Sequence, residues 1–210
     1  MKEIYLFSTS SHPDAMSINS LEIKLFKPEI NFSDYDYLII TSKQAVNALK
    51  QYEISEFSNK KALCVSKQSA LSYQNIGGKI LTVGSGYGDN LIKIIQNYPK
   101  DTKWLYLRAT KVASDFAIIC NKSGYNISQK IVYESNCSSQ ILKSIATKGA
   151  TLIFTSPSSV ACYLKNNTIS PFDNIIVIGK TTAKMLPDNV SFHIANEPNI
   201  QSCIDLAHKL

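Results

Sequence analysis

Short apolar runs alternate with segments of helical period along the whole chain. The runs are rich in Ile, Leu, Val and Tyr, and the segments after them carry apolar residues three and four positions apart, as at Ala45, Val46 and Leu49. This alternation predicts α/β architecture, with parallel sheets flanked by helices. Strands are expected at residues 4–7, 21–26, 37–41, 62–65, 80–83, 104–107, 129–134, 151–155, 175–178 and 191–195.

The sequence repeats itself. Residues 38–46 read LIITSKQAV and residues 152–160 read LIFTSPSSV, identical at five of nine positions. Two further pairs follow in the same order, with ALCVSKQSA at 62–70 opposite IIVIGKTTA at 175–183, and KEIYLFST at 2–9 opposite KWLYLRAT at 103–110. A duplication predicts two similar half-molecules of flavodoxin-like size, five strands in each. A cleft between two such halves is the first place to expect a ligand.

Small polar residues stand where several helices should begin and end. Gly124 is expected to end a helix that starts at Lys111. The residues in N-cap positions are Ser42, Ser66, Ser156 and Thr181.

Length and cysteine usage narrow the class of protein. The 210 residues fit two domains of roughly 100 residues each. The N-terminal apolar run is too short for a signal peptide, and no run approaches the roughly 20 apolar residues of a membrane helix, so a soluble, cytoplasmic protein is expected. The five cysteines occur singly, which argues against a zinc site and a disulfide framework and favours small core residues. They are Cys64, Cys120, Cys137, Cys162 and Cys203.

The positive net charge of the chain can be interpreted in two ways. The net charge of +6 suits an anionic ligand, but the basic residues are nearly all Lys in a chain rich in Ile, Asn and Lys, so compositional bias explains it equally well. Arg108, the only Arg, follows WLYL and is expected to face a ligand above the sheet edge. Because no Lys/Arg cluster with interleaved aromatic residues occurs, a nucleic acid partner is not expected.

Five strand ends share a small-polar junction with the helix that follows. Backbone N–H groups without intrahelical partners and the helix dipole make such junctions potential anion sites, although Ser and Thr can also serve only as caps. Their repetition favours a polyanionic ligand. The junctions are Thr41-Ser42-Lys43, Val65-Ser66-Lys67, Gly84-Ser85-Gly86, Thr155-Ser156-Pro157 and Gly179-Lys180-Thr181-Thr182.

Several familiar catalytic signatures are missing from the sequence. It contains no G-x-G-x-x-G after a strand, no phosphate-binding G-x-x-x-x-G-K-[ST] loop and no G-x-S-x-G elbow. His12, His193 and His208 are far apart and define no metal site or triad. We therefore expect no metal and no cofactor, and a chemistry based on positioning and hydrogen bonding.

Taken together, these motifs resemble the uroporphyrinogen III synthase family over nearly the whole chain. The most distinctive piece is IGKTTA at 178–183, followed by a short helix and the tail ANEPNIQSCIDLAHKL at 195–210. The resemblance implies two flavodoxin-like α/β domains joined by a two-stranded β-ladder, whose strands would be LEIKLF at 21–26 and KIVYES at 130–135. It places one discontinuous domain at 1–24 and 136–210 and an inserted domain at 27–133.

The resemblance also implies a reaction. A lyase of this family closes the linear tetrapyrrole hydroxymethylbilane into uroporphyrinogen III, with loss of water and inversion of ring D through a proposed spiro intermediate, and needs no cofactor. The substrate carries eight carboxylates, which agrees with the positive charge and the strand-end junctions. The expected partner is this small polycarboxylate, with a transient hand-over from the preceding pathway enzyme and no membrane.

Site residues follow from the matching motifs. Tyr133 falls on the Tyr of the family's V-Y motif and could hydrogen-bond the departing hydroxyl, although a Tyr that only packs is the alternative. Thr181 falls on the first Thr of the IG-x-TT motif and is a second catalytic candidate. The residues expected to bind substrate carboxylates are Ser42, Lys43, Ser66, Ser85, Arg108, Thr155, Ser156, Lys180 and Thr182.

A non-catalytic function remains as a second interpretation. Periplasmic binding proteins and cytoplasmic sensors also close two similar α/β halves on an anion. The formation of isomer III rather than the spontaneous isomer I from hydroxymethylbilane distinguishes the enzyme from a binding module.

Overall fold

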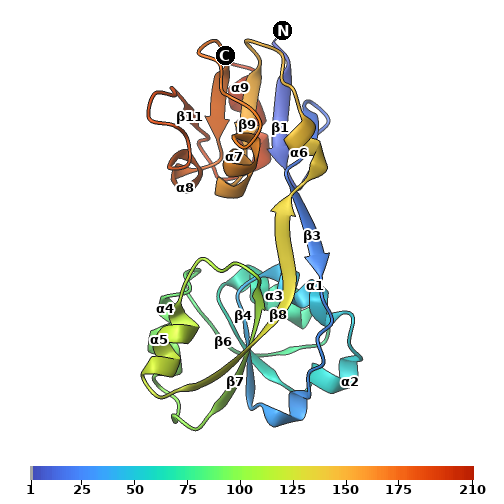
Figure 1. Cartoon of the computed structure of the whole chain (residues 1–210), viewed down its shortest axis with the longest axis vertical. Coiled ribbons are helices and arrows are strands. Elements are labelled where there is room, and N and C mark those ends of the chain that lie inside the picture. Colours follow the sequence, from blue (N-terminus) through green and yellow to red (C-terminus); the bar gives the residue numbers. More distant parts are fainter. Residues whose placement is uncertain (1) are drawn as a thin grey trace. The chain divides into compact units, whose positions relative to one another are not determined.

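A computed structural model describes residues 2–210, and the chain divides into two compact units (Figure 1). Unit 1 consists of the residues up to Glu22 together with Asn136–Leu210, and unit 2 is the continuous segment Ile23–Ser135. The chain passes from unit 1 into unit 2 through β3 (Leu21–Leu25) and returns through β8 (Asn126–Cys137).

Unit 1 is built on a five-stranded sheet in the order β11-β10-β9-β1-β2, in which every pair of neighbours is parallel. Its strands are β1 (Ile4–Ser8), β2 (Met16–Asn19), β9 (Thr151–Phe154), β10 (Asn174–Val177) and β11 (His193–Ile194). Its helices are α6 (Ser139–Lys143), α7 (Pro157–Tyr163), α8 (Lys180–Ala183) and α9 (Ile200–Ala207).

Unit 2 holds a six-stranded sheet in the order β3-β8-β7-β4-β5-β6, parallel from β8 to β6. Besides β3 and β8, its strands are β4 (Tyr37–Ile40), β5 (Lys61–Cys64), β6 (Lys79–Val83) and β7 (Lys103–Ala109). Its helices are the 3₁₀ helix η1 (Phe32–Asp34), α1 (Lys43–Leu49), α2 (Ile54–Phe57), α3 (Lys67–Gln74), α4 (Asn90–Ile95) and α5 (Phe116–Lys122).

Both sheets are covered on both faces, as their continuous apolar strands require. In unit 1, Phe154 packs in one core cluster and its neighbour Ile153 in another. In unit 2, Leu38 lies in the cluster on one face, and Ile39 joins Trp104 on the other. The predicted α/β class with two parallel sheets is therefore confirmed.

Each predicted strand overlaps an observed one, but β2 escapes the sequence pattern. Met16–Asn19 is an edge strand that pairs only with β1, and none of its residues is buried. A strand with no buried face needs no apolar alternation, so its sequence MSIN is indistinguishable from a loop.

The repeat exists, but its halves are not the folding units. The sheet order β2-β1-β9-β10-β11 of unit 1 corresponds to β8-β7-β4-β5-β6 of unit 2. The first half of the sequence supplies β1 and β2 to unit 1 and β4 to β6 to unit 2, while the second half does the reverse. The expectation that each half forms its own compact molecule is therefore wrong, because each unit combines strands from both halves.

The alignment of KEIYLFST with KWLYLRAT is also wrong by one residue. In the ladders, Leu152 lies opposite Tyr5, and the equivalent Leu38 lies opposite Leu105. Tyr5 therefore corresponds to Leu105 and not to Tyr106, although the Tyr residues match by identity. A shift of one residue moves a side chain to the other face of the sheet, and Tyr106 indeed packs in the opposite cluster from Leu105.

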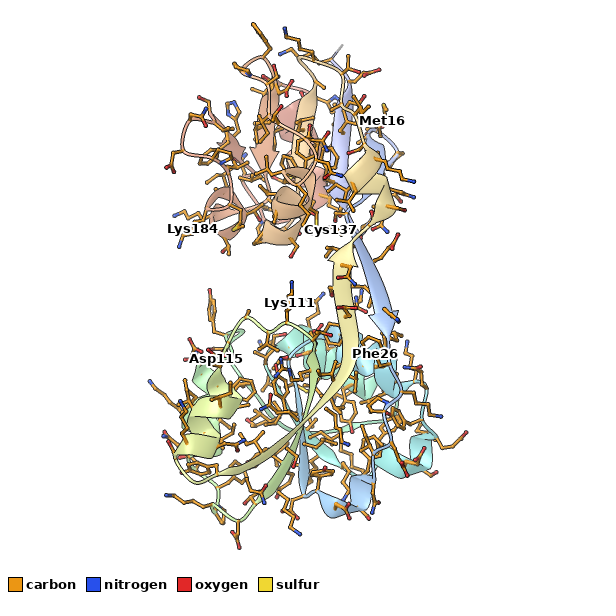
Figure 2. The ribbon with its side chains drawn as sticks, viewed as in Figure 1. Met16, Phe26, Lys111, Asp115, Cys137 and Lys184 are labelled. Carbon is orange, nitrogen blue, oxygen red and sulfur yellow. A yellow bond between two sulfur atoms is a disulfide. The ribbon has the colours of Figure 1, made fainter. Side chains whose placement is uncertain are left out.

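Two of the five cysteines form a disulfide, contrary to the expectation that all are small core residues. Cys137 at the end of β8 and Cys162 in α7 are bonded, with 5.4 Å between their Cα atoms (Figure 2). The other three, Cys64, Cys120 and Cys203, are free and buried as predicted. Single cysteines 25 residues apart give no spacing signal, so only the fold reveals this pair.

We expect non-reducing denaturation with an alkylating agent to label Cys64, Cys120 and Cys203 and to leave Cys137 and Cys162 unmodified. Reduction should lower the free energy of unfolding by about 3 kcal/mol, because a closed loop of this length restricts the unfolded chain. Mass spectrometry of the labelled peptides checks the pairing. Five labelled cysteines in protein purified without reductant would contradict it.

Candidate active site

Unit 2 carries a cavity of about 290 Å³ at the carboxyl edge of its parallel sheet. The edge includes the point between β4 and β7 where the strand order reverses, which is where open α/β sheets bind ligands. The cavity is lined by Thr41, Val65, Gly86, Gly88, Tyr106, Ala109, Lys111, Val112, Ala113, Ser114, Phe116 and Tyr133.

Tyr133 reaches this cavity because the ladder between β7 and β8 is irregular. Arg108 lies opposite Ile131, but the next residue, Ala109, lies opposite Tyr133. The extra residue, Val132, disturbs the alternation of faces, so Val132 and Tyr133 are buried in succession after the exposed Ile131. The backbone N–H of Thr110 donates to the Tyr133 carbonyl over 3.0 Å and fixes the position of this residue.

Tyr106 and Thr41 place a second pair of hydroxyl groups at the cavity. The two oxygens are 3.1 Å apart, with Tyr106 on β7 and Thr41 directly after the neighbouring strand β4. Burial raises the pKa of Tyr106, and the hydrogen bond with Thr41 opposes this rise. Tyr133 raises the pKa further and Arg108 lowers it, which agrees with the proximity of all four side chains. The phenol therefore stays protonated at neutral pH.

Two loops form the remaining wall of the cavity. The loop after β6 is held to β5 because the Gly86 N–H donates to the Val65 carbonyl over 2.8 Å. Gly88 approaches Ser114 so closely that a Cβ on this glycine would lie 2.6 Å from the Ser114 Cβ. Ser114 Oγ in turn donates to Asp89 Oδ1 over 2.5 Å. Only glycine at position 88 allows the two loops to meet.

The second of these loops corrects the expected helix from Lys111. The helix α5 begins at Phe116 and is followed by Gly124 with φ of +87° as predicted, but residues 111–115 form the loop after β7. Lys111 lies in this loop (Figure 2) and is the only charged residue among those that line the cavity. An anionic group fits this lining better than a cationic one.

Arg108 has most of its guanidinium engaged by protein groups. Its Nε donates to the Ala109 carbonyl over 2.9 Å, Nη2 to the Thr110 carbonyl over 3.0 Å and Nη1 to Gln129 Oε1 over 2.8 Å. Two of the five N–H donors thus hold the end of β7 and the turn after it, and a third links Arg108 to β8. Carboxylate binding by Arg108 stays a prediction, and it would use the two remaining donors.

The predicted binding residues of unit 2 surround the cavity without lining it. Ser42 and Ser66 are N-caps of α1 and α3 as predicted, with their side chains accepting from the backbone N–H groups of Gln44 and Ser69. Lys43 is exposed, and the exposed Ser85 accepts from the Asn90 side chain. Each strand-end motif was located correctly, but the cavity is lined by the neighbours Thr41, Val65, Gly86 and Ala109.

The predicted residues of unit 1 gather at the carboxyl ends of β9 and β10. Thr155 Oγ1 donates to the Phe7 carbonyl over 3.2 Å, across the reversal point between β9 and β1. Ser156 caps α7 as predicted, with its hydroxyl accepting from the Ser159 N–H. Thr182 is buried, and its N–H donates to the Gly179 carbonyl over 3.0 Å.

Thr181 is not a helix N-cap, contrary to the prediction. The N-cap of α8 is Gly179, so Thr181 is the second residue of the helix, and its side chain is exposed together with that of Lys180. The motif gives four polar positions in succession, and spacing alone cannot tell which of them begins the helix. Tyr133 belongs to unit 2 and Thr181 to unit 1.

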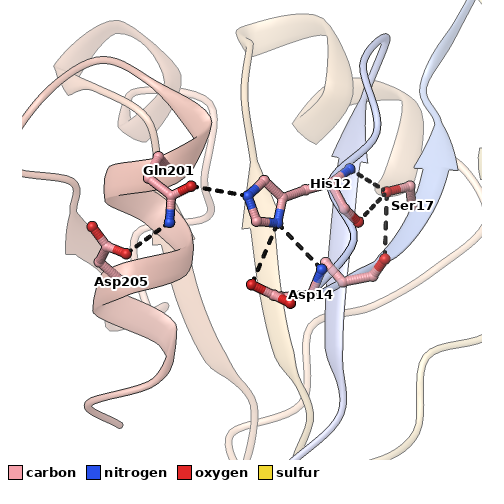
Figure 3. Close-up of polar contacts among 6 residues, drawn as sticks. His12, Asp14, Ser17, Gln201 and Asp205 are labelled. Atoms are coloured by element: carbon pink, nitrogen blue, oxygen red, sulfur yellow. Dashed lines mark hydrogen bonds and ion pairs between the residues drawn. The ribbon is translucent and has the colours of Figure 1, made fainter.

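His12 links the loop after β1 to α9 (Figure 3). His12 Nδ1 lies 3.3 Å from the backbone nitrogen of Asp14, and its Nε2 lies 3.1 Å from Gln201 Oε1. Gln201 is oriented by its own bond of 2.8 Å to Asp205 Oδ1. Both ring nitrogens are in hydrogen-bond contact with protein groups, so His12 connects the loop after β1 to α9.

Sequence reasoning missed Tyr106, Lys111 and Ser114 as cavity residues. Tyr106 was overlooked because a Tyr within WLYL reads as one more apolar strand residue. Lys111 and Ser114 were assigned to a helix. Their position directly after a strand of the parallel sheet was the one available signal.

Comparisons with known proteins agree with this architecture. The family model described as Uroporphyrinogen-III synthase HemD matches residues 14–205. A crystal structure of uroporphyrinogen-III synthetase from Helicobacter pylori 26695 is similar, with a TM-score of 0.82 and 24% sequence identity over 100% of this chain and 99% of that one. A mutant uroporphyrinogen III synthase from the extremely thermophilic bacterium Thermus thermophilus has a TM-score of 0.64 and 11% identity over 100% and 98% of the two chains. Among curated proteins, no sequence matches.

The fold is that of a two-unit α/β protein with two parallel sheets, and unit 2 carries a cavity lined by one Lys among its described residues. The chain belongs to the uroporphyrinogen-III synthase family. Members are cofactor-independent, lyase-type enzymes of tetrapyrrole biosynthesis, and the reaction of this chain is the cyclisation of hydroxymethylbilane to uroporphyrinogen III. Nothing favours the non-catalytic alternative. Within residues 2–210, no helix has the length and apolarity needed to cross a membrane.

We expect Gly88→Ala to destabilise the protein by about 1–3 kcal/mol, because the added methyl group would overlap Ser114 and separate the two loops. Thermal unfolding measures this loss. Adding Ser114→Gly to the same chain should recover part of it, because the overlapping atoms are removed. A loss of equal size in the double variant would contradict the close approach.

Proposed function

We propose that the cavity of unit 2 contributes to the active site of this synthase, with Tyr133 as the residue that assists departure of the hydroxyl group. The observation that carries the proposal is the β-bulge that turns Tyr133 into a cavity with one Lys and no acidic residue among its described lining. Bulges commonly redirect side chains next to active sites.

The reaction requires little acid–base catalysis by the protein. The electron-rich pyrroles of hydroxymethylbilane drive off the terminal hydroxyl, which leaves as water once it has gained a proton. A phenolic O–H that hydrogen-bonds the departing oxygen lowers the barrier by stabilising the developing charge. The remaining task is to hold the chain curled, so that ring D closes at the inverted position.

We further propose that the strand-end residues of both units bind the carboxylates of the substrate. Thr181 would offer an exposed second hydroxyl to the reacting end, since it is not occupied as a cap. The carboxylate-binding residues would be Ser42, Lys43, Ser66, Ser85, Arg108, Thr155, Ser156, Lys180 and Thr182. Where the hydroxyl already caps a helix, as in Ser42, Ser66 and Ser156, the contact would use neighbouring backbone N–H groups.

Three broader features belong to the same proposal. The two domains of the enzyme would be residues 1–24 with 136–210, and residues 27–133. The protein would work in the cytoplasm and receive its unstable substrate by transient hand-over from the preceding pathway enzyme. Cell fractionation tests the location. In the coupled reaction with the preceding enzyme, direct hand-over predicts no lag in isomer III formation, and a lag would contradict it.

The activity itself is tested by supplying hydroxymethylbilane and separating the product isomers. The enzyme should yield isomer III, whereas the uncatalysed reaction yields isomer I. Isomer I alone, at the uncatalysed rate, would leave only a binding function.

We expect Tyr133→Phe to lower turnover by roughly ten- to a thousandfold while the fold is retained, the range for loss of one positioned donor. Tyr125→Phe is a matched control, because Tyr125 is a Tyr of the same unit outside the cavity lining. Turnover of isomer III is measured for both variants. Unchanged turnover in Tyr133→Phe would remove Tyr133 from the mechanism.

Thr181→Ala should reduce turnover less than Tyr133→Phe and change the free energy of unfolding by no more than about 0.5 kcal/mol, because the side chain is exposed and caps no helix. Thermal unfolding and the isomer assay measure the two effects. Full isomer III production by the Tyr133→Phe, Thr181→Ala double variant would show that neither hydroxyl takes part.

A further inference from the structure

The hydroxyl pair of Tyr106 and Thr41 has a hydrogen that no protein group accepts. Each hydroxyl carries one hydrogen, and the single bond of 3.1 Å between them uses one of the two. Among the described residues, neither oxygen has another hydrogen-bond partner. One O–H donor of this pair is therefore left for whatever occupies the cavity that both residues line.

Tyr106 is the better donor of the two. A phenol is more acidic than an aliphatic hydroxyl, so in the presence of a strong acceptor the Tyr106 O–H turns to that acceptor and the Thr41 O–H donates to the phenol oxygen. Tyr106 is only 3% exposed, and its ring packs against that of Phe116, with 4.8 Å between the ring centroids. The donor is thus held in one place before the ligand arrives, which limits the entropy lost on binding.

The surroundings of the pair select an anion. Lys111 supplies a positive charge, and no acidic residue occurs among the described residues that line the cavity. A volume of about 290 Å³ lies at the lower end of the range for drug-sized ligands, so it suits one arm of a tetrapyrrole better than the whole molecule.

We propose that the Tyr106 hydroxyl, supported by Thr41, binds one carboxylate of the substrate at the base of this cavity. The inference rests on the proposed function, because it takes the cavity of unit 2 as part of the substrate site. Tyr106 touches the substrate, and Thr41 acts through Tyr106 as a positioning residue. A carboxylate remote from the reacting carbon is bound equally in the ground state and the transition state. Loss of the hydrogen bond to it therefore raises KM and leaves kcat unchanged.

The test uses Tyr106→Phe, which keeps the aromatic ring and removes only the hydroxyl. We expect KM for hydroxymethylbilane to rise about tenfold, which equals about 1.4 kcal/mol, with kcat within about twofold of the parent. The Kd for uroporphyrin III, an octacarboxylate probe measured by fluorescence, should rise by a similar factor. Tyr37→Phe is the matched control, because Tyr37 begins β4 at the opposite edge of the same sheet, and it should change neither value.

Thr41→Val tests the supporting role of the second hydroxyl. In the parent chain we expect a rise in KM of roughly threefold, and in the Tyr106→Phe chain no further rise, because Thr41 acts only through Tyr106. Circular dichroism of all variants checks that the fold is retained. If the two substitutions raised KM by equal factors that multiply in the double variant, the assigned roles would be overturned.

The possible results distinguish failure of the Tyr106 carboxylate site from failure of the proposed synthase function. If the parent forms isomer III and Tyr106→Phe keeps its KM and its Kd for uroporphyrin III, the carboxylate site is wrong and the synthase function stands. A fall in kcat at unchanged KM would also overturn it, since the hydroxyl would then act in the chemical step. If the parent forms no isomer III, the proposed function fails, and unchanged uroporphyrin III binding by Tyr106→Phe would then refute the site independently.

Discussion

The pairing of β1 with β9 and of β4 with β7 is the interaction on which the rest of the structure depends. Each pair joins strands from different halves of the sequence at the centre of a parallel sheet, and each creates the reversal of strand order beside which side chains can meet a ligand. The cavity lies at one of these points, and the hydrogen bond from Thr155 to Phe7 crosses the other. Without these pairings neither sheet would be complete.

The sequence predicts the features that depend on local chemistry. Ser42, Ser66 and Ser156 cap helices because a short hydroxyl side chain can accept from a backbone N–H two or three residues further on. Continuous apolar runs mark the central strands because both faces of a parallel sheet are buried. The family motif makes Tyr133 a candidate, and the β-bulge explains why this residue lines the cavity.

Features set by pairing between distant segments were beyond the reach of the sequence. The one-residue error at Tyr5 arose because identity matched Tyr with Tyr, whereas the ladder aligns the residues that share a face. The bond between Cys137 and Cys162 depends on where β8 ends relative to α7, and no spacing rule encodes this. Arg108 was expected at a ligand, and the sequence could not show that one of its donors is taken by Gln129, which lies near it only because β7 pairs with β8.

The exchange of strands between halves has a consequence for synthesis on the ribosome. Unit 2 is one continuous segment and can complete its sheet as soon as Ser135 has emerged. The strands β1 and β2 are made before unit 2, but β9, the partner of β1, follows more than a hundred residues later. Until then the apolar strand β1 lacks its partner on that side, and an unpaired apolar strand is the kind of surface that chaperones bind. The order of translation therefore makes unit 1, although it contains β1 and β2, the later of the two units to complete its sheet.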